Sequence, residues 1–139
     1  MSLTKSVITK TLTLITAITL NAVVAHAAVV PHTDAAKHYG QKVTIEGTVV
    51  ATSCDGKRCY INFHEDFRKA VSAIIETADI AKFSKAAEAT AQQADLDKAY
   101  KGKKVHLTGT VTEYKSKDAS KPSRPQMSLT SPADIKVVK

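Results

Sequence analysis

Few side chains form a pattern suited to covalent chemistry or metal binding, and the clearest of these lie between residues 54 and 66. The only two cysteines, Cys54 and Cys59, flank residues 55–58 (DGKR). Asp-Gly is a strong hairpin signal, and a hairpin would place the two cysteines opposite each other, within reach of a disulfide. A metal site needs more ligands than this pair supplies, and a redox-active pair usually has the closer C-x-x-C spacing. We therefore predict a structural disulfide.

Residues 64–66 (HED) form the only compact group of metal-binding or acid–base side chains. They fall at a predicted turn, where solvated polar side chains are normal. His38 and His106 have no partner that the sequence indicates, and the carboxylates form no evident pair. The chain also has no Gly-rich phosphate loop and no nucleophile motif. We therefore expect no enzyme activity, no metal and no cofactor.

Basic side chains, by contrast, gather in three predicted loops, and two tyrosines accompany them. The candidate nucleic-acid-binding residues are Lys57, Arg58, Tyr60, Arg68, Lys69, Tyr114, Lys115, Lys117, Lys121 and Arg124. Proteins that bind single strands combine a positive groove with aromatic rings on which bases stack. Alternation places Tyr60 outward and Phe63 inward, while Phe67 falls at a turn. A run of charges is also typical of an ordinary solvated face, which is the alternative interpretation.

One stretch occurs twice in the chain. Residues 40–49 (GQKVTIEGTV) return as residues 102–111 (GKKVHLTGTV), and a tyrosine lies shortly before each copy. Both copies alternate apolar and polar residues, which is the period of a half-buried strand. Gly47 and Gly109 fall where the next inward side chain would lie. Because a glycine inside a strand usually marks a bulge or a bend, we expect two long, bent strands of one small barrel.

The remaining pattern predicts five strands and one helical segment. The strands are expected at about residues 41–52, 58–64, 70–76 and 103–114, and from residue 125 onward, with polar turns over 53–57 and 65–69. Residues 77–99 are rich in alanine and contain no Gly or Pro, which favours a helix. Residues 115–124 (KSKDASKPSR) read as a basic loop. Gly102 suits the left-handed conformation that ends a helix.

The first 27 residues have the pattern of a secretory signal peptide. Lys5 and Lys10 precede an uncharged apolar run, and residues 25–27 (AHA) form a small-x-small cleavage site. An uncleaved membrane anchor is the alternative, although the run is short for a span. Cleavage would leave 112 of 139 residues, and the 20 lysines and arginines would fall to 18 against 13 acids, a net charge of +5. We expect a signal peptide over 1–27, a flexible lead or short first helix over 28–38 and one domain over 39–139.

The order of three strands, a helix and two strands is that of an OB-fold. The fold class predicted is therefore all-β with one inserted helix: a five-stranded Greek-key OB-fold barrel with its helix between the third and fourth strands. A small α+β sandwich is the alternative. Ligands of OB-folds bind over the second and third strands, between the first and last hairpin loops. The three basic loops would flank that face.

Three segments also resemble a known family, the small bacterial OB-fold domains of the nucleic-acid-binding type. In that family a Y-x-G-K-x-V-x-V-T-G strand is followed closely by G-R-P-Q-I and a terminal P-x-x-I-x-V. The matching residues here are Tyr100, Gly102, Lys103, Val105, Thr108 and Gly109, then Arg124, Pro125, Gln126, Pro132, Ile135 and Val137. The turn of the family is stretched here into residues 115–123. A looser similarity, in compartment and strand order, is to periplasmic stress-associated OB-fold proteins.

The resemblance and the basic loops together imply a binding module. The arginine cluster and aspartate-rich metal strand of thermonuclease, another OB barrel, are absent. We expect a monomeric, exported protein, periplasmic or secreted, without a membrane span once the leader is removed. Nucleic acid, preferably single-stranded, is the first partner expected. A small anionic ligand or an envelope protein, in a module acting in envelope stress, is the alternative.

Overall fold

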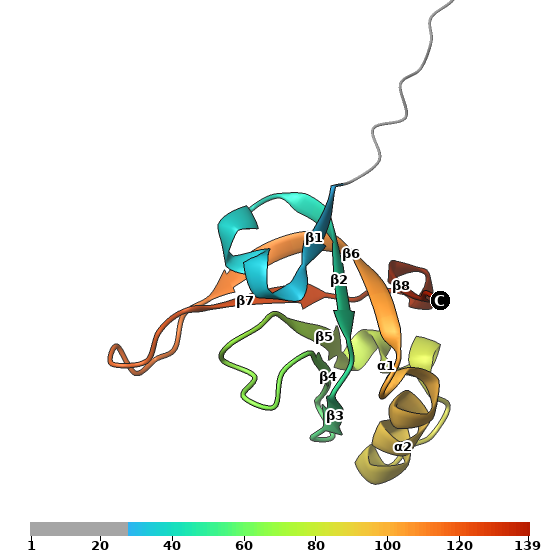
Figure 1. Cartoon of the computed structure of the whole chain (residues 1–139). Coiled ribbons are helices and arrows are strands. Elements are labelled where there is room, and N and C mark those ends of the chain that lie inside the picture. Colours follow the sequence, from blue (N-terminus) through green and yellow to red (C-terminus); the bar gives the residue numbers. More distant parts are fainter. Residues whose placement is uncertain (1–27) are drawn as a thin grey trace, which may run out of the picture.

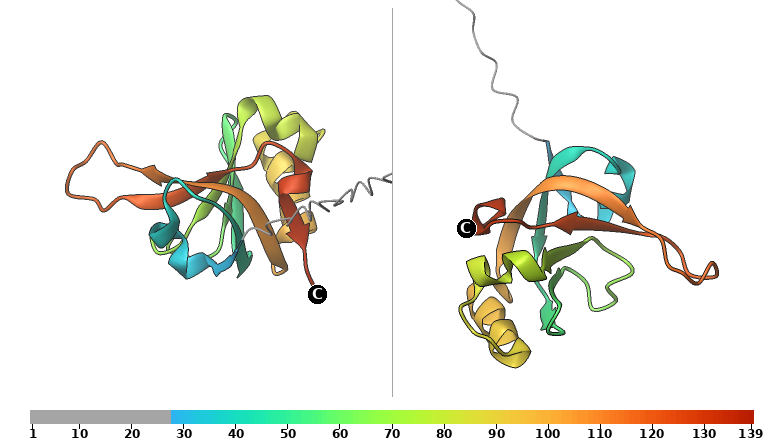
Figure 2. Two further views of the ribbon diagram at one scale, coloured as in Figure 1. Left: turned by 90° about the horizontal axis from the view of Figure 1, so that it is seen from above. Right: turned by 180° about the vertical axis from the view of Figure 1, so that it is seen from behind.

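The computed structural model describes residues 28–139 (Figure 1). The predicted signal peptide lies outside the described residues. Among residues 28–139, no helix has the length and apolar character needed to cross a membrane. The loop between β6 (Lys104–Tyr114) and β7 (Arg124–Ser128) extends from one side of the sheet, while α1 (Thr77–Phe83) and α2 (Ala89–Tyr100) lie on the other side (Figures 1 and 2).

The two copies of the repeated stretch pair with each other. β2 (Lys42–Thr48) lies antiparallel to β6, with Ile45 opposite Leu107 at the centre of the pairing. The register is reciprocal, because Gly47 of the first copy lies opposite Val105 at the start of the second. Ile45 and Leu107 are both completely buried, so the apolar residues of each copy face the core as predicted.

The other strands extend this pair into one curved sheet. They are β7, whose bounds are given above, together with β1 (Val29–Pro31), β3 (Ala51–Cys54), β4 (Arg58–Asn62), β5 (Ser72–Glu76) and β8 (Ile135–Val137). The strand order is β1-β2-β6-β7-β5-β4-β3, with β8 paired to β6, and β5 and β7 are parallel. This mostly β structure is consistent with the predicted OB-fold barrel. The strand count differs, since the sheet has eight strands and its order does not close on itself.

The first predicted strand, residues 41–52, is divided in two because the chain changes partner within it. The backbone N–H of Val49 donates to Lys103, whereas that of Val50 donates to Asn62 in β4. Residues before this point therefore pair with β6, and those after it pair with β4. As a result, β2 and β3 occupy distant places in the strand order although only two residues separate them.

Residues 28–38, predicted as a flexible lead or short first helix, form β1 and a 3-10 helix over His32–His38. β1 runs parallel to β2, with Val30 opposite Ile45. Val30 and Ala35 are buried in the core, which explains why this segment is ordered. The strand and helix therefore belong to the folded unit rather than preceding it.

The helical segment predicted over 77–99 is two helices, α1 and α2, with a break at Ser84. The hydroxyl of Ser84 accepts a hydrogen bond from the backbone of Ala86 and donates one to Asp95, 2.5 Å away. Serine readily bonds to nearby backbone in this way, which competes with helix continuation. α2 then runs beside β3, where Asp97 accepts a 2.6 Å hydrogen bond from Thr52.

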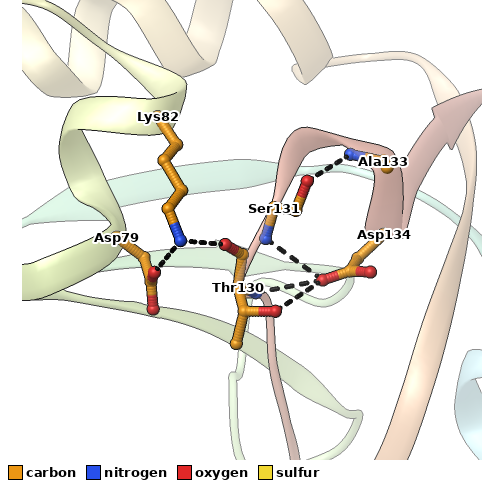
Figure 3. Close-up of polar contacts among 6 residues, drawn as sticks. All are labelled: Asp79, Lys82, Thr130, Ser131, Ala133 and Asp134. Carbon is orange, nitrogen blue, oxygen red and sulfur yellow. Dashed lines mark hydrogen bonds and ion pairs between the residues drawn. The ribbon is translucent and has the colours of Figure 1, made fainter.

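A polar network attaches α1 to the segment after β7 (Figure 3). Lys82 donates to the carboxylate of Asp79 at 2.6 Å and to the backbone oxygen of Thr130 at 2.9 Å. Asp134 in turn accepts from the backbone N–H groups of Thr130 and Ser131. Lys82 thus links α1 to the segment after β7. Because a substitution of Lys82 would disturb this contact, the residue is not suitable as a control position in binding experiments.

The predicted disulfide between Cys54 and Cys59 is confirmed. The two residues are opposite each other in the β3–β4 hairpin, and Asp55 accepts hydrogen bonds from the backbone of Lys57 and Arg58 to close the turn. These bonds lower the pKa of Asp55, since they stabilise the carboxylate.

Removing this disulfide should have a modest effect on stability. We expect the Cys54→Ser, Cys59→Ser double variant to lose about 2 kcal/mol in the free energy of unfolding, because the closed loop is short. Urea titration of the purified variant and the oxidised protein measures the difference. A loss above roughly 4 kcal/mol would mean that the bond holds more of the fold than this hairpin.

Candidate nucleic-acid interface

The outward side of β4, β5 and β7 carries a row of neutral polar side chains. Alternation along β4 turns Tyr60 and Asn62 away from the core, while Cys59 and Ile61 are buried. Asn62 pairs with Ser72 of β5, which pairs with Gln126 of β7. Ser72 Oγ donates to Asn62 Oδ1 at 2.9 Å, which leaves the Asn62 amide nitrogen available to donate.

These side chains line a recess of about 200 Å³, called here the first recess. Its lining residues are Ser53, Tyr60, Asn62, Phe67, Ser72, Arg124 and Gln126. Four of the seven are hydroxyl or amide side chains without charge, and two are aromatic. Such a surface offers a flat ligand both a ring to stack on and hydrogen-bonding groups for its edge.

Arg124 occupies the boundary of this recess, stacked between two aromatic rings. Its guanidinium carbon lies 4.6 Å from the centroid of Phe67 and 4.5 Å from that of Tyr114. Tyr114 and Arg124 are cross-strand partners at the end of the β6–β7 pair, so sheet register brings them together. Arg124 Nε is buried and makes no hydrogen bond with any residue between 28 and 139. The guanidinium is thus held in place by aromatic faces, while its Nε donor has no partner among the described residues.

A second recess adjoins the first and has two lining residues in common with it, Arg124 and Phe67. It measures about 270 Å³, and its lining residues are Phe67, Arg68, Tyr114, Ser116, Lys121, Pro122 and Arg124. Three of these seven are cationic, so this second recess differs from the first in charge. An anionic group is the ligand that such a lining favours.

Several of the predicted basic residues are already paired with carboxylates. Arg58 Nε lies 2.7 Å from Glu76, its partner across β4 and β5, and this hydrogen bond raises the Arg58 pKa. The Arg68 side chain makes two hydrogen bonds to Asp66, of 2.8 and 3.2 Å, and its backbone N–H makes a third of 3.1 Å; these bonds lower the Asp66 pKa.

The pairs in the last loop are longer than those of Arg58 and Arg68. Lys115 lies 3.8 Å from Glu113, and Lys121 lies 3.9 Å from Asp118. Lys57, Lys69, Lys117 and Arg124 make no ion pair with any other residue in the described part of the chain. The positive field over this face is therefore weaker than the number of basic residues suggests.

The structure brings together half of the candidate residues and leaves the others outside the two recesses. Those that line a recess are Tyr60, Arg68, Tyr114, Lys121 and Arg124. Those that line neither are Lys57, Arg58, Lys69, Lys115 and Lys117. Lys57 is at the tip of the β3–β4 hairpin, and Lys115 and Lys117 are in the β6–β7 loop.

Seven lining residues were missed by the sequence analysis as site residues: Ser53, Asn62, Phe67, Ser72 and Gln126 of the first recess, and Ser116 and Pro122 of the second. Asn62 could have been found, because alternation places it on the same face as Tyr60. Phe67 gave a weaker signal, that of a large apolar residue in a polar turn. The structure shows why it is there: the ring is 46% exposed, and it covers Arg124.

Residues 64–66 lie in a local turn, as predicted. The backbone N–H of Asp66 donates to His64 Nδ1 at 2.9 Å, while the Asp66 carboxylate binds Arg68. Between residues 28 and 139, no group of three or more His, Cys, Asp or Glu side chains is placed to hold a metal ion.

Comparisons with solved structures show a shared fold. The chain is similar to an aspartyl-tRNA synthetase from Entamoeba histolytica, with 16% identity, a TM-score of 0.52, and coverage of 81% of this chain and 21% of the synthetase. It is also similar to a protein described as an aspartyl-tRNA synthetase from Leishmania major Friedlin, with 14% identity, a TM-score of 0.50, and coverage of 87% and 22%. The chain therefore spans about a fifth of the length of each. No protein-family model matches the chain, and neither does any curated protein.

Proposed function

We propose that this protein is a non-enzymatic OB-fold module that binds nucleic acid, preferably single-stranded, over β4, β5 and β7. The observation that carries the proposal is Arg124, a cation stacked on Phe67 and Tyr114 that has an unsatisfied buried Nε and lines both recesses. The similar solved structures support it, since their names describe enzymes that act on tRNA. In this interpretation β2 with β3, then β4, β5, β6 and β7, are the five strands of a Greek-key barrel.

The chemistry of the site suits a single strand. A planar guanidinium binds phosphate oxygens through two parallel hydrogen bonds, and aromatic faces beside it accept unpaired bases. Tyr60 and Phe67 line the first recess, where a base of a duplex could not enter without leaving its stack. Lys57, Lys69 and Lys117 would add phosphate contacts around the face.

We further propose that the protein acts outside the cytoplasm, as a monomer in the periplasm or secreted from the cell. The leader pattern of residues 1–27 supports export. The Cys54–Cys59 disulfide is a second support, because such bonds persist in oxidising compartments.

Titration at two or more salt concentrations tests the proposal. We expect single-stranded DNA or RNA to bind more tightly than duplex DNA of the same length. If about four phosphates are neutralised, log affinity should fall against log salt with a slope near −3, at about 0.7 per contact for single strands. Affinity that does not change with salt, or no binding at low salt, would contradict the proposal.

A second candidate function is binding of a small anionic ligand or a protein of the cell envelope, as in a module for envelope stress. The observation that favours it is the ion pairing of Arg58 and Arg68, which withdraws charge from the face. A partner of this kind would bind in the recesses, and its affinity would not fall steeply with salt as the affinity of a polyanion does.

The Asp66–Arg68 ion pair predicts a variant that binds more tightly, whereas most substitutions in the site should weaken binding. Asp66→Asn should raise affinity for single strands about two- to fivefold, because Arg68 lines the second recess and would no longer be neutralised. The salt slope should steepen by about 0.7, the equivalent of one more phosphate contact. Fluorescence anisotropy over a salt series measures both quantities.

Glu88→Gln is the matched control, since it makes the same change in net charge just before α2, a helix that lies on the side of the sheet away from the β6–β7 loop (Figure 1). If Glu88→Gln raises affinity as much as Asp66→Asn, the effect comes from net charge and does not depend on the recess.

A further inference from the structure

The two recesses that meet at Arg124 differ in chemistry, and this difference bears on what the site recognises. The first recess is lined by neutral amides and hydroxyls beside aromatic rings, whereas the second is lined by Arg68, Lys121 and Arg124. Phosphate is negative and carries no base information, while base edges are neutral and offer donors and acceptors. A surface used only for phosphates would have cations in both recesses.

We propose, on the basis of the nucleic-acid function proposed above, that the site reads base identity: one base enters the first recess and its neighbouring phosphate lies in the second. Arg124 and Phe67 line both recesses and so stand between base and phosphate. The protein is then a base-selective single-strand binder, and one nucleotide unit fills the site.

The first recess has the size and groups for one base. Its volume of about 200 Å³ is below the roughly 300–1,000 Å³ typical of pockets for whole small molecules, so a single flat ring system suits it. Asn62 is fixed by its bond from Ser72, so its amide nitrogen has a defined position. Gln126 follows in the same row of the sheet, and its side chain makes no hydrogen bond with the described residues. Together the two amides supply the paired donor and acceptor that a base edge needs.

The second recess is suited to phosphate by charge and by its supply of donors. The guanidinium of Arg124 is stacked at about 4.5 Å on Tyr114 and thereby oriented, and Lys121 is only weakly paired at 3.9 Å from Asp118. A phosphate can displace Asp118 from Lys121. The 3.9 Å separation of Lys121 from Asp118 is too long for a hydrogen bond, whereas a charge-assisted hydrogen bond to a phosphate oxygen forms at about 2.7–2.9 Å.

The experiment compares short homo-oligomers of adenine, cytosine and thymine nucleotides with an abasic oligomer of equal length. Anisotropy of the full chain with each oligomer gives the affinities. We expect one base to bind at least about fivefold more tightly than another, since a good amide–base pair supplies 1–3 kcal/mol of discrimination. The abasic oligomer should bind more weakly than all three.

Variants separate the two recesses. Gln126→Ala, and Asn62→Ala with Gln126→Ala, should reduce the spread between bases to less than about twofold while the salt slope stays unchanged. Lys121→Ala should weaken binding to every oligomer alike, including the abasic one, and should reduce the slope by about 0.7. Lys98→Ala is the control, in a helix (α2) that lies on the side of the sheet away from the β6–β7 loop (Figure 1). It should change neither the spread between bases nor the salt slope. Gln126→Ala serves where the double variant fails to fold, because the Gln126 side chain makes no hydrogen bond with any residue in the part of the chain that the structure describes.

The outcomes distinguish this inference from the function on which it rests. Equal affinity for all homo-oligomers and the abasic strand, with binding still dependent on Lys121, would overturn base selection and leave nucleic-acid binding standing. An absence of binding to any oligomer at low salt would overturn both. A spread between bases that survives in Gln126→Ala and in the double variant would place base reading outside the first recess and also overturn the inference.

Discussion

Replacing Arg124 with alanine should reduce affinity for single-stranded nucleic acid about ten- to hundredfold. The variant loses one phosphate contact and the cation that both aromatic rings cover. Stacking of a base on an aromatic ring alone supplies roughly 1–3 kcal/mol, and that stack would be disordered once Phe67 and Tyr114 lose their shared partner. The affinity of Arg124→Lys should lie between those of the parent protein and Arg124→Ala, because lysine keeps the charge but lacks the planar guanidinium.

Anisotropy titration at fixed salt measures the loss, and Lys98→Ala is again the control. The fold should tolerate Arg124→Ala, because Arg124 Nε makes no hydrogen bond to the described residues and each cation–π contact near the surface supplies only about 0.5–1 kcal/mol. A thermal scan checks this directly. Affinity within twofold of the parent protein, in a folded variant, would show that the interface lies elsewhere.

The order of the elements and the local pairings were accessible from the sequence because their signals are local. The repeat predicted two matching strands, and the structure pairs them with Ile45 opposite Leu107. Asp-Gly between two cysteines predicted the disulfide hairpin. Gly102 has a φ of 76°, as expected for a glycine that follows a helix. In the hairpin and at the helix end the deciding residues lie within a few positions of one another, and the alternation within each copy of the repeat is equally local, whereas the pairing of the two copies was not predicted.

What could not be predicted depends on register between distant segments. The stack of Arg124 on Tyr114 requires that β6 and β7 pair with these two residues opposite each other, across a loop whose length does not fix the register. The neutralisation of Arg58 likewise depends on its alignment with Glu76 in β5. A count of basic residues therefore overstated the charge of the face. The conformation of residues 28–38 depends on the pairing of Val30 with Ile45, which is also a contact between separate segments of the chain.

Gly47 and Gly109 do not have the bulge that a glycine inside a strand can mark, and what the structure shows there leads to a second prediction. Neither glycine forms a bulge, since the register from Lys42 to Thr48 runs without interruption against β6. The positive φ values among the glycines belong to Gly40, Gly56 and Gly102 instead. Both strand glycines are required by close approach of a neighbour, and the two neighbours differ in how far they can move.

Gly47→Ala should be the most destabilising single substitution of a strand glycine. A Cβ at Gly47 would lie 2.6 Å from the Phe63 ring and 2.8 Å from His32 Nδ1, and these two rings are stacked on each other. Phe63 is buried in the core and cannot move without disturbing it, so the free energy of unfolding should fall by about 1–3 kcal/mol. The thermal midpoint should fall by roughly 4 °C or more.

Gly109→Ala is the internal comparison, because it makes the same change at the equivalent place in the other copy of the repeat. Its Cβ would lie 3.1 Å from Met127 Cγ and 3.2 Å from Met127 Sδ, and methionine is flexible enough to shift by a few tenths of an ångström. We expect a loss below about 1 kcal/mol there. Urea titration of both variants gives the two values. Equal losses would mean that the glycines serve the bending of the two strands, whereas a much larger loss at Gly47 would show that the rings of Phe63 and His32 set the requirement.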